Sequence, residues 1–300
     1  MTERECRLKA LLDEKVLLYN RPAFIEKDPV SVPHLFTEKR DIEIAGFFAA
    51  VLAWGNRTAI INSCRRLLDW MDYRPYEFIL QHRDTDLKPF LRFAHRTFNA
   101  TDLLYFFHFL QYHYRHFDSL EDAFMPGIVP THIGSGREDI HGFPVPAPVL
   151  PHAVQSVREA IPADTGTPAP VYNGDTVEQA LVSFHDYFFS LGHPGRTRKH
   201  IATPARKSAC KRLNMYLRWM VRSDGQGVDF GIWRRLSPRQ LVCPLDVHVA
   251  RVAHRLGLLP DDRASWHNAL ALTRRLRRFN REDPAVYDYA LFGLGMAERL

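Results

Sequence analysis

Apolar residues recur at the spacing of an α-helix along almost all of this 300-residue chain. The pattern predicts an all-α fold, with helices near residues 3–19, 40–54, 58–72, 75–82, 87–96, 101–117, 175–191, 205–222, 246–256, 264–278 and 284–298. Hydrophobic residues make up 46% of the chain, which is enough for a globular core.

A proline-rich segment interrupts this helical pattern. Residues 126–174 hold nine of the twenty prolines, and we interpret them as an irregular insertion with one short helical piece near residues 152–160. The chain is thereby divided into an N-terminal helical region (1–125), the insertion (126–174) and a C-terminal helical region (175–300). We expect two helical subdomains, in which helices from both ends of the chain share one subdomain.

The C-terminal region contains an unusually cationic segment. Residues 187–223 include no Asp or Glu, but they include nine Lys or Arg residues. Within the helix predicted over 205–222, one face carries Lys207, Lys211, Asn214, Arg218 and Arg222. A cationic face without acids favours a polyanionic partner. The alternative is a solvated amphipathic helix.

A single aspartate follows this segment at the start of another predicted helix. The sequence from Cys243 to Leu258 is CPLDVHVARVAHRLGL, in which Asp246 suits the N-cap and Gly257 suits the C′ position. Capping alone explains Asp246. A helix N-terminus also keeps a carboxylate ionised, as an electrostatic catalyst requires, so the two interpretations are compatible.

Together these two features resemble the helix-hairpin-helix DNA glycosylases, in which a lysine-bearing helix is followed by a catalytic aspartate. The matching motif consists of Asp246, His248, Val249, Arg251, Arg255, Leu256 and Gly257. The layout is most similar to the archaeal 8-oxoguanine glycosylases, because the hairpin is atypical and the connector over residues 223–240 is long. The phrases CKRLNMYLRWMVR, HRTFN, AWGNR and YDYALFGLG also resemble a bacterial family of uncharacterised proteins.

The glycosylase resemblance implies that Asp246 is the catalytic carboxylate and that a lysine near the start of the preceding helix is the nucleophile. We expect Lys211 in this role, with Lys207 as the alternative. A carboxylate stabilises the positive charge that develops on the sugar, and a neutral amine can then form a Schiff base. Arg206 and Arg212 are candidates for lowering the pKa of that amine.

The resemblance also implies a set of DNA contacts. The expected DNA-binding residues are Asn56, Arg57, Arg196, Arg198, Lys199, Arg206, Arg212, Asn214, Arg218 and His248. Asn56 has an alternative role as the cap of the helix near 58–72. The glycines that grip a DNA phosphate in the family's hairpin are missing here, because residues 200–205 read HIATPA.

The expected function is therefore a DNA glycosylase, with or without AP lyase activity, that removes a damaged base, for which an oxidised purine is the leading candidate. The expected partner is double-stranded DNA carrying that base, and a net charge of +6 suits it. One alternative is a non-catalytic DNA-binding protein on the same scaffold. Another is a helical metal-dependent hydrolase, whose candidate ligands are His108, His113, His116, Asp246 and His248; of these, His113 and His116 have the i, i+3 spacing that can chelate a metal.

Several further expectations concern what the protein lacks. The four cysteines are scattered singly, which argues against disulfides, a zinc ribbon and an iron–sulfur cluster. We expect no cofactor and no bound metal. The charged N-terminus does not resemble a signal peptide, and the longest apolar stretch is too short to span a membrane. We therefore expect a cytoplasmic monomer.

Overall fold

The structure, a computed structural model, describes residues 1–127 and 171–297, and these residues are mostly helical. The α-helices are α1 (Glu3–Tyr19), α2 (Lys39–Val51), α3 (Arg57–Asp69), α4 (Pro75–Gln81), α5 (Ala100–Tyr114), α6 (Glu178–Phe188), α7 (Lys211–Val221), α8 (Val247–Arg255), α9 (Trp266–Arg277) and α10 (Tyr287–Ala297). Short 3-10 helices span Pro22–Lys27, Pro29–Ser31, Pro33–Leu35, Asp84–Arg92, Leu120–Phe124, Gly195–His200, Pro204–Arg206, Pro238–Gln240 and Pro284–Val286. In the described part of the chain, strands occur only as the hairpin of β1 (Ala94–His95) and β2 (Phe98–Asn99).

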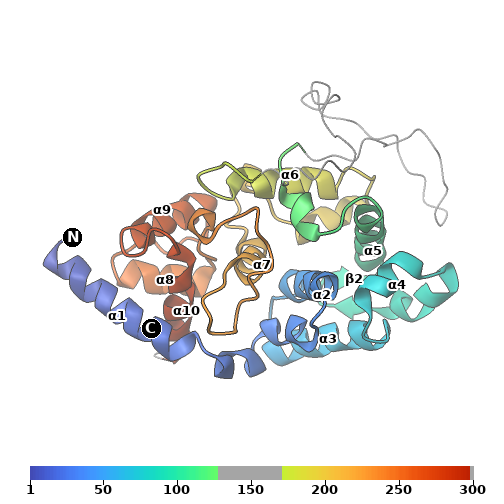
Figure 1. The fold of residues 1–300 in the computed structure, drawn as a ribbon, viewed down its shortest axis with the longest axis horizontal. Helices are drawn as coiled ribbons and strands as arrows, with labels where there is room; N and C mark the ends of the chain where they lie inside the picture. Colours follow the sequence, from blue (N-terminus) through green and yellow to red (C-terminus); the bar gives the residue numbers. More distant parts are fainter. Residues whose placement is uncertain (128–170, 298–300) are drawn as a thin grey trace.

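Helix α7 lies at the centre of the molecule, with α2 to α5 on one side and α8 to α10 on the other (Figure 1). It packs against α2, and α8 packs against α10. The first helix, α1, lies along α10, so the two ends of the chain meet on the same side. The predicted all-α class is confirmed. The predicted division into regions 1–125, 126–174 and 175–300 stays a prediction, and residues 128–170, with the helical piece near 152–160, lie outside the described residues.

The predicted helix over residues 205–222 is wrong in its first six residues. The α-helix begins only at Lys211, and the residues before it form a 3-10 turn and an irregular approach. Lys207 has a φ angle of 59° and Cys210 one of 49°, and such left-handed residues break a right-handed helix. The helix predicted over 87–96 is also wrong, because these residues form a 3-10 helix and the first strand of the hairpin.

A buried carboxylate joins four separate segments around the core. Glu43 of α2 is fully buried and accepts hydrogen bonds from the hydroxyl of Tyr114 at 2.9 Å and from the backbone N–H of Leu120 at 3.0 Å. The hydroxyl of Ser119 donates to it at 2.5 Å and the indole N–H of Trp233 at 2.7 Å. Burial raises the pKa of Glu43, whereas the hydrogen bonds from Ser119, Leu120 and Trp233 act in the opposite direction. These donors therefore offset the cost of burying the carboxylate.

The described helices include none that is long and apolar enough to cross a membrane. This observation concerns single helices only.

Replacing Glu43 with Gln should lower the free energy of unfolding by about 3 kcal/mol, because one acceptor oxygen becomes an amide NH2 group, a donor that faces other buried donors. Urea denaturation followed by circular dichroism measures the change. Glu38→Gln is the matched control, since Glu38 is exposed and its side chain does not cap α2. Equal stability of the two variants would contradict the role assigned to Glu43.

Candidate active site

A cavity of about 320 Å³ lies where the first turns of α7 and α8 meet. Its lining is contributed by segments that are far apart in the sequence. The lining residues are Val51, His200, Ala202, Ser208, Ala209, Cys210, Lys211, Arg212, Leu213, Leu245, Asp246, Val247 and Ala264. The cavity therefore contains both the predicted carboxylate and one of the two predicted lysines.

Asp246 is the N-cap of α8. Its Oδ1 accepts hydrogen bonds from the backbone N–H groups of His248 and Val249, each at 2.9 Å. The left-handed φ of 73° at Gly257 follows the end of the same helix, as the capping pattern predicted. Because Oδ1 is engaged in the cap, Oδ2 is the carboxylate oxygen that faces the cavity and Lys211.

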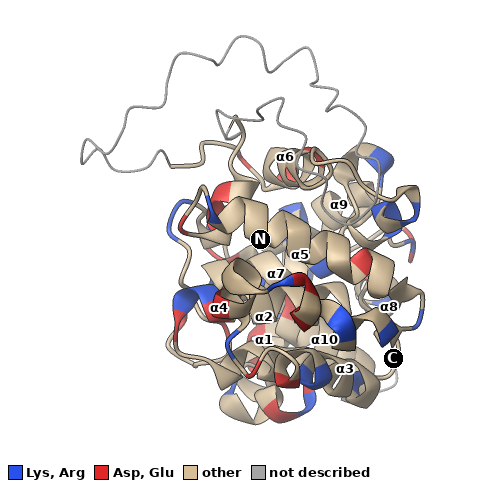
Figure 2. Cartoon of the chain, turned by 90° about the vertical axis from the view of Figure 1, so that its right-hand side faces the viewer, with Lys and Arg blue, Asp and Glu red and all other residues tan. Residues whose placement is uncertain are grey.

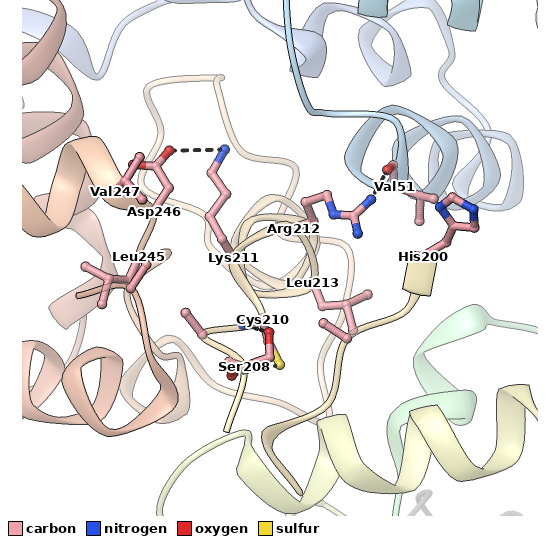
Figure 3. A pocket seen from close by; sticks show the side chains of 13 residues that line it. Val51, His200, Ser208, Cys210, Lys211, Arg212, Leu213, Leu245, Asp246 and Val247 are labelled. Atoms are coloured by element: carbon pink, nitrogen blue, oxygen red, sulfur yellow. Dashed lines mark hydrogen bonds and ion pairs between the residues drawn. The ribbon is translucent and has the colours of Figure 1, made fainter. Parts of the chain in front are cut away.

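Lys211 is the first residue of α7, and its Nζ lies 3.9 Å from Asp246 Oδ2. The two side chains are 27% and 28% exposed, so both are reachable from the cavity. Figure 3 shows them facing each other from α7 and from the start of α8. Two helix N-termini thus line one cavity. The N-terminus of α8 is occupied by the Asp246 carboxylate, whereas that of α7 has no side-chain cap and can favour an acceptor group of a ligand.

The charge environment of Lys211 differs from the predicted one. We expected arginines beside the amine, whereas its ion-pair partner is the carboxylate of Asp246. Two buried carboxylates, Asp28 and Asp288, also interact with it electrostatically. Burial raises the pKa of Asp288 to about 6, against the opposing effects of Arg218 and Lys211.

The residues predicted on the DNA-facing side of this helix are buried, and this part of the prediction is wrong. Asn214, Arg218 and Arg222 are 1%, 3% and 1% exposed. The amide of Asn214 donates to the backbone carbonyl of Ala209 at 3.0 Å. A guanidinium group can be buried only with partners, and here carboxylates surround both arginines instead of phosphates.

These carboxylates come from the connector after α7 and from the C-terminal part of the chain. Arg218 pairs with Asp288 and lies 3.4 Å from Asp229. Arg222 pairs with Asp229, with Asp283 at 2.9 Å and with Asp224 at 2.5 Å. The aromatic ring of Tyr289 lies 4.2 Å from the Arg218 guanidinium. Arg218 and Arg222 therefore form ion pairs inside the core.

Arg212 is partly buried at the cavity wall. Its guanidinium donates to the backbone carbonyl of Val51 and lies 4.9 Å from the centre of the Trp54 ring. Burial lowers its pKa to about 10. Lys207 is exposed, and its carbonyl accepts the N–H of Trp266 at 3.1 Å. Because Lys207 does not line the cavity, the structure favours Lys211 of the two predicted lysines.

Asn56 and Arg57 lie at the junction of α2 and α3. Asn56 caps α3 by accepting the N–H of Ala59 at 3.1 Å, as the alternative interpretation predicted. The guanidinium of Arg57 lies 4.7 Å from the centre of the Phe292 ring. Both side chains therefore have contacts within the protein that explain their positions without DNA.

The remaining predicted DNA contacts are on the surface. Arg196, Arg198, Lys199, Arg206 and His248 are exposed. Arg196 donates to the carbonyl of Thr97 at 2.9 Å, and Arg198 donates to the His193 ring at 2.6 Å. On the face that Figure 2 shows, Lys and Arg occupy several separate places with Asp and Glu among them. On that face, charge alone does not single out a site.

One wall of the cavity contains a histidine that the sequence did not single out. His200 is 4% exposed, and its Nε2 lies 3.2 Å from the Oδ2 of Asp102, which is fully buried. The pattern Asn99-x-x-Asp102 indicates a capping box, which the structure contains. It does not indicate the histidine, because the two segments meet only in the folded chain.

In the described part of the chain, no three His, Cys, Asp or Glu side chains lie close enough together to bind a metal ion. The structure there gives no support to the metal-dependent hydrolase. His113 is buried, with the Tyr187 hydroxyl at 3.2 Å and the Ser119 carbonyl at 2.9 Å from its ring nitrogens. Burial lowers its pKa to about 4. The four cysteines, all within the described residues, are unpaired.

Comparison with known families places the whole cavity inside one family match. Residues 28–297 match the model of DUF2400, described as a protein of unknown function. The chain belongs to the DUF2400 family. Comparisons with the curated proteins and with the solved structures gave no match. The family adds no activity to the geometry, and the resemblance to helix-hairpin-helix glycosylases stays a prediction.

Replacing Arg218 with Met should lower the free energy of unfolding by about 3–5 kcal/mol, because it leaves buried carboxylates without their cation. Urea denaturation of the full chain measures this loss. Lys199→Met is the control, since Lys199 is exposed and the change should stay within about 0.5 kcal/mol. An Arg218→Met variant of unchanged stability that no longer binds DNA would restore the original interpretation of this face.

Proposed function

We propose that the protein is a DNA glycosylase with lyase activity, in which Lys211 is the nucleophile and Asp246 the catalytic carboxylate. The observation that carries the proposal is the distance of 3.9 Å between Lys211 Nζ and Asp246 Oδ2 at the edge of a cavity of about 320 Å³. Ligand pockets in proteins start at about 300 Å³, so an extruded base fits the scale of this cavity.

The two groups have complementary tasks in this reaction. As the bond between the base and the sugar breaks, its electron pair leaves with the base and positive charge develops at C1′. The Asp246 carboxylate stabilises that charge. The ammonium group of Lys211 first passes a proton to the departing base. The neutral amine then forms the new bond to C1′ and loses a second proton to Asp246. Loss of the sugar-ring oxygen from C1′ then leaves an imine between the lysine and the opened sugar.

The position of each group at a helix end supports the proposal. Asp246 is held by two backbone N–H groups, which fix its orientation and favour its charged form. Lys211 begins a helix whose later residues are locked in the core. A nucleophile and a carboxylate on rigid elements meet the requirement that both act on one carbon atom.

DNA would be held by the exposed cations on the 3-10 helix Gly195–His200 and the turn that follows. Arg196, Arg198, Lys199 and Arg206 are exposed there, next in sequence to the cavity wall. These exposed members of the cationic segment can neutralise phosphates without disrupting the core. The preferred damaged base, an oxidised purine in our expectation, belongs to the same proposal.

Borohydride should trap a covalent adduct between the wild-type protein and duplex DNA with an abasic site, because it reduces the imine to a stable amine. Lys211→Gln should abolish the adduct, observed as a shifted band on a denaturing gel. Lys207→Gln should retain it, since Lys207 does not line the cavity. Absence of an adduct in the wild type, or its loss only in the Lys207 variant, contradicts the assignment of Lys211.

Asp246→Asn should slow base release by about 10²- to 10³-fold, since it removes the charge that stabilises the sugar cation. Single-turnover kinetics on damaged duplex DNA measure the rate. Asn is as good an N-cap as Asp, so the unfolding free energy should change little. A folded variant with an unchanged rate would show that Asp246 caps α8 and has no catalytic role.

A further inference from the structure

The cavity has a second wall, away from the lysine and the carboxylate, whose polar groups have no task in the proposed base release. Figure 3 shows His200 beside Val51 on this side, with Arg212 between it and Lys211. A base held for cleavage must present its sugar bond to Lys211, so its far edge points to this wall. The groups on this wall therefore determine which bases the cavity accepts, provided that the proposed function holds.

The first turn of α7 supplies hydrogen-bond donors to the cavity. Its N-cap, Cys210, has a left-handed backbone, and its side chain makes no capping hydrogen bond. Within the described residues, the N–H groups of Lys211, Arg212 and Leu213 have no acceptor. These residues line the cavity, and Leu213 is only 2% exposed. A buried helix end without partners calls for an acceptor from a ligand.

His200 supplies a second polar group, and its chemistry is set by Asp102. The Asp102 carboxylate accepts a hydrogen bond from the Thr197 hydroxyl at 2.9 Å and lies 3.3 Å from the Arg196 guanidinium. Burial acts to raise the pKa of Asp102, but hydrogen bonds from His200, the Asn99 backbone and Thr197 outweigh it and hold the pKa below its ordinary value. Asp102 is therefore ionised.

An ionised carboxylate favours an N–H group on the nitrogen that faces it, because it can only accept a hydrogen bond. Asp102 Oδ2 lies 3.2 Å from Nε2 of His200, and no other group of the described residues partners this buried nitrogen. This closeness favours the neutral tautomer with the proton on Nε2, which leaves a lone pair on Nδ1. Nδ1 has no hydrogen-bond partner among the described residues. The ring of Trp54 is stacked on the imidazole with ring centres 5.9 Å apart, and Phe98 makes a T-shaped contact with it at 4.9 Å, so the orientation of the imidazole is held.

We propose that this wall recognises a lactam, the adjacent N–H and C=O of an oxo-base, with His200 as the specificity residue and Asp102 as the residue that positions it. The α7 N–H groups donate to the carbonyl oxygen, and His200 Nδ1 accepts the lactam N–H. Uracil, hypoxanthine and 8-oxoguanine each present such an edge. Bases without a lactam, such as 3-methyladenine and 1,N6-ethenoadenine, leave these groups unpaired.

The test compares base release from duplexes that contain one of these five bases, at single turnover. The wild type should prefer the lactam bases by about 10- to 100-fold. His200→Leu should lose this preference. His200→Asn should retain most of it, because the Asn oxygen can stand where Nδ1 stands. Asp102→Asn should reduce the preference, since the proton on the ring is no longer directed to Nε2.

The borohydride adduct on an abasic site separates the two proposals, because an abasic site has no base to recognise. The wild-type protein should form that adduct whichever bases it releases. If the wild type forms it but releases bases with no preference for lactams, or releases none, the lactam inference is wrong and the lysine chemistry stands. Without any adduct, the proposed function itself fails.

Circular dichroism confirms that each variant is folded. If His200→Leu is not folded, the comparison of His200→Asn with Asp102→Asn decides. An equal lactam preference in wild type, His200→Asn and Asp102→Asn would overturn the positioning role of Asp102. A His200→Leu variant that is folded and keeps the wild-type preference would overturn the role of His200.

Discussion

Two arginines buried at the centre of the molecule organise the parts around them. Arg218 and Arg222 of α7 are 3% and 1% exposed, and a guanidinium cannot lose its proton to escape burial. Each charge must be matched by carboxylates inside the protein. Those carboxylates, Asp229, Asp283 and Asp288, stand on the connector after α7, before α10 and on α10. The ion pairs therefore bind three segments to one helix.

This network also determines the geometry of the cavity. Helix α10 carries Asp288, which pairs with Arg218 of α7, and α10 packs against α8, which Asp246 caps. The helices that carry Lys211 and Asp246 are therefore both held in place by α10. A distance between two catalytic groups is reliable only when the elements that carry them share such a support. The C-terminal half of α7 carries the buried arginines, and its first turn lines the cavity with Lys211.

The sequence predicted most of the helices and the role of Asp246 as a cap, because both depend on local patterns. It was wrong over residues 87–96 and 205–210, where a hairpin and left-handed residues interrupt the helical backbone. It did not predict the fate of Asn214 and Arg218, because a cationic helix face looks the same whether phosphates or carboxylates neutralise it. The absence of acids from residues 187–223 was real, but the matching acids lie beyond it. Asp288, a lone acid in the apolar phrase YDYALFGLG, was the available signal for a buried partner.

The 3-10 helix Gly195–His200 connects the surface charge to the cavity. Its exposed side chains Arg196, Arg198 and Lys199 lie on the same short turn as the buried His200. Arg196 reaches toward Asp102, which also faces His200, so a phosphate drawn to this arginine would compete with the carboxylate that positions the histidine. Under the proposed function, binding of the DNA backbone and recognition of a base would be coupled on this turn, since both would depend on how the charge of Asp102 is shared between Arg196 and His200.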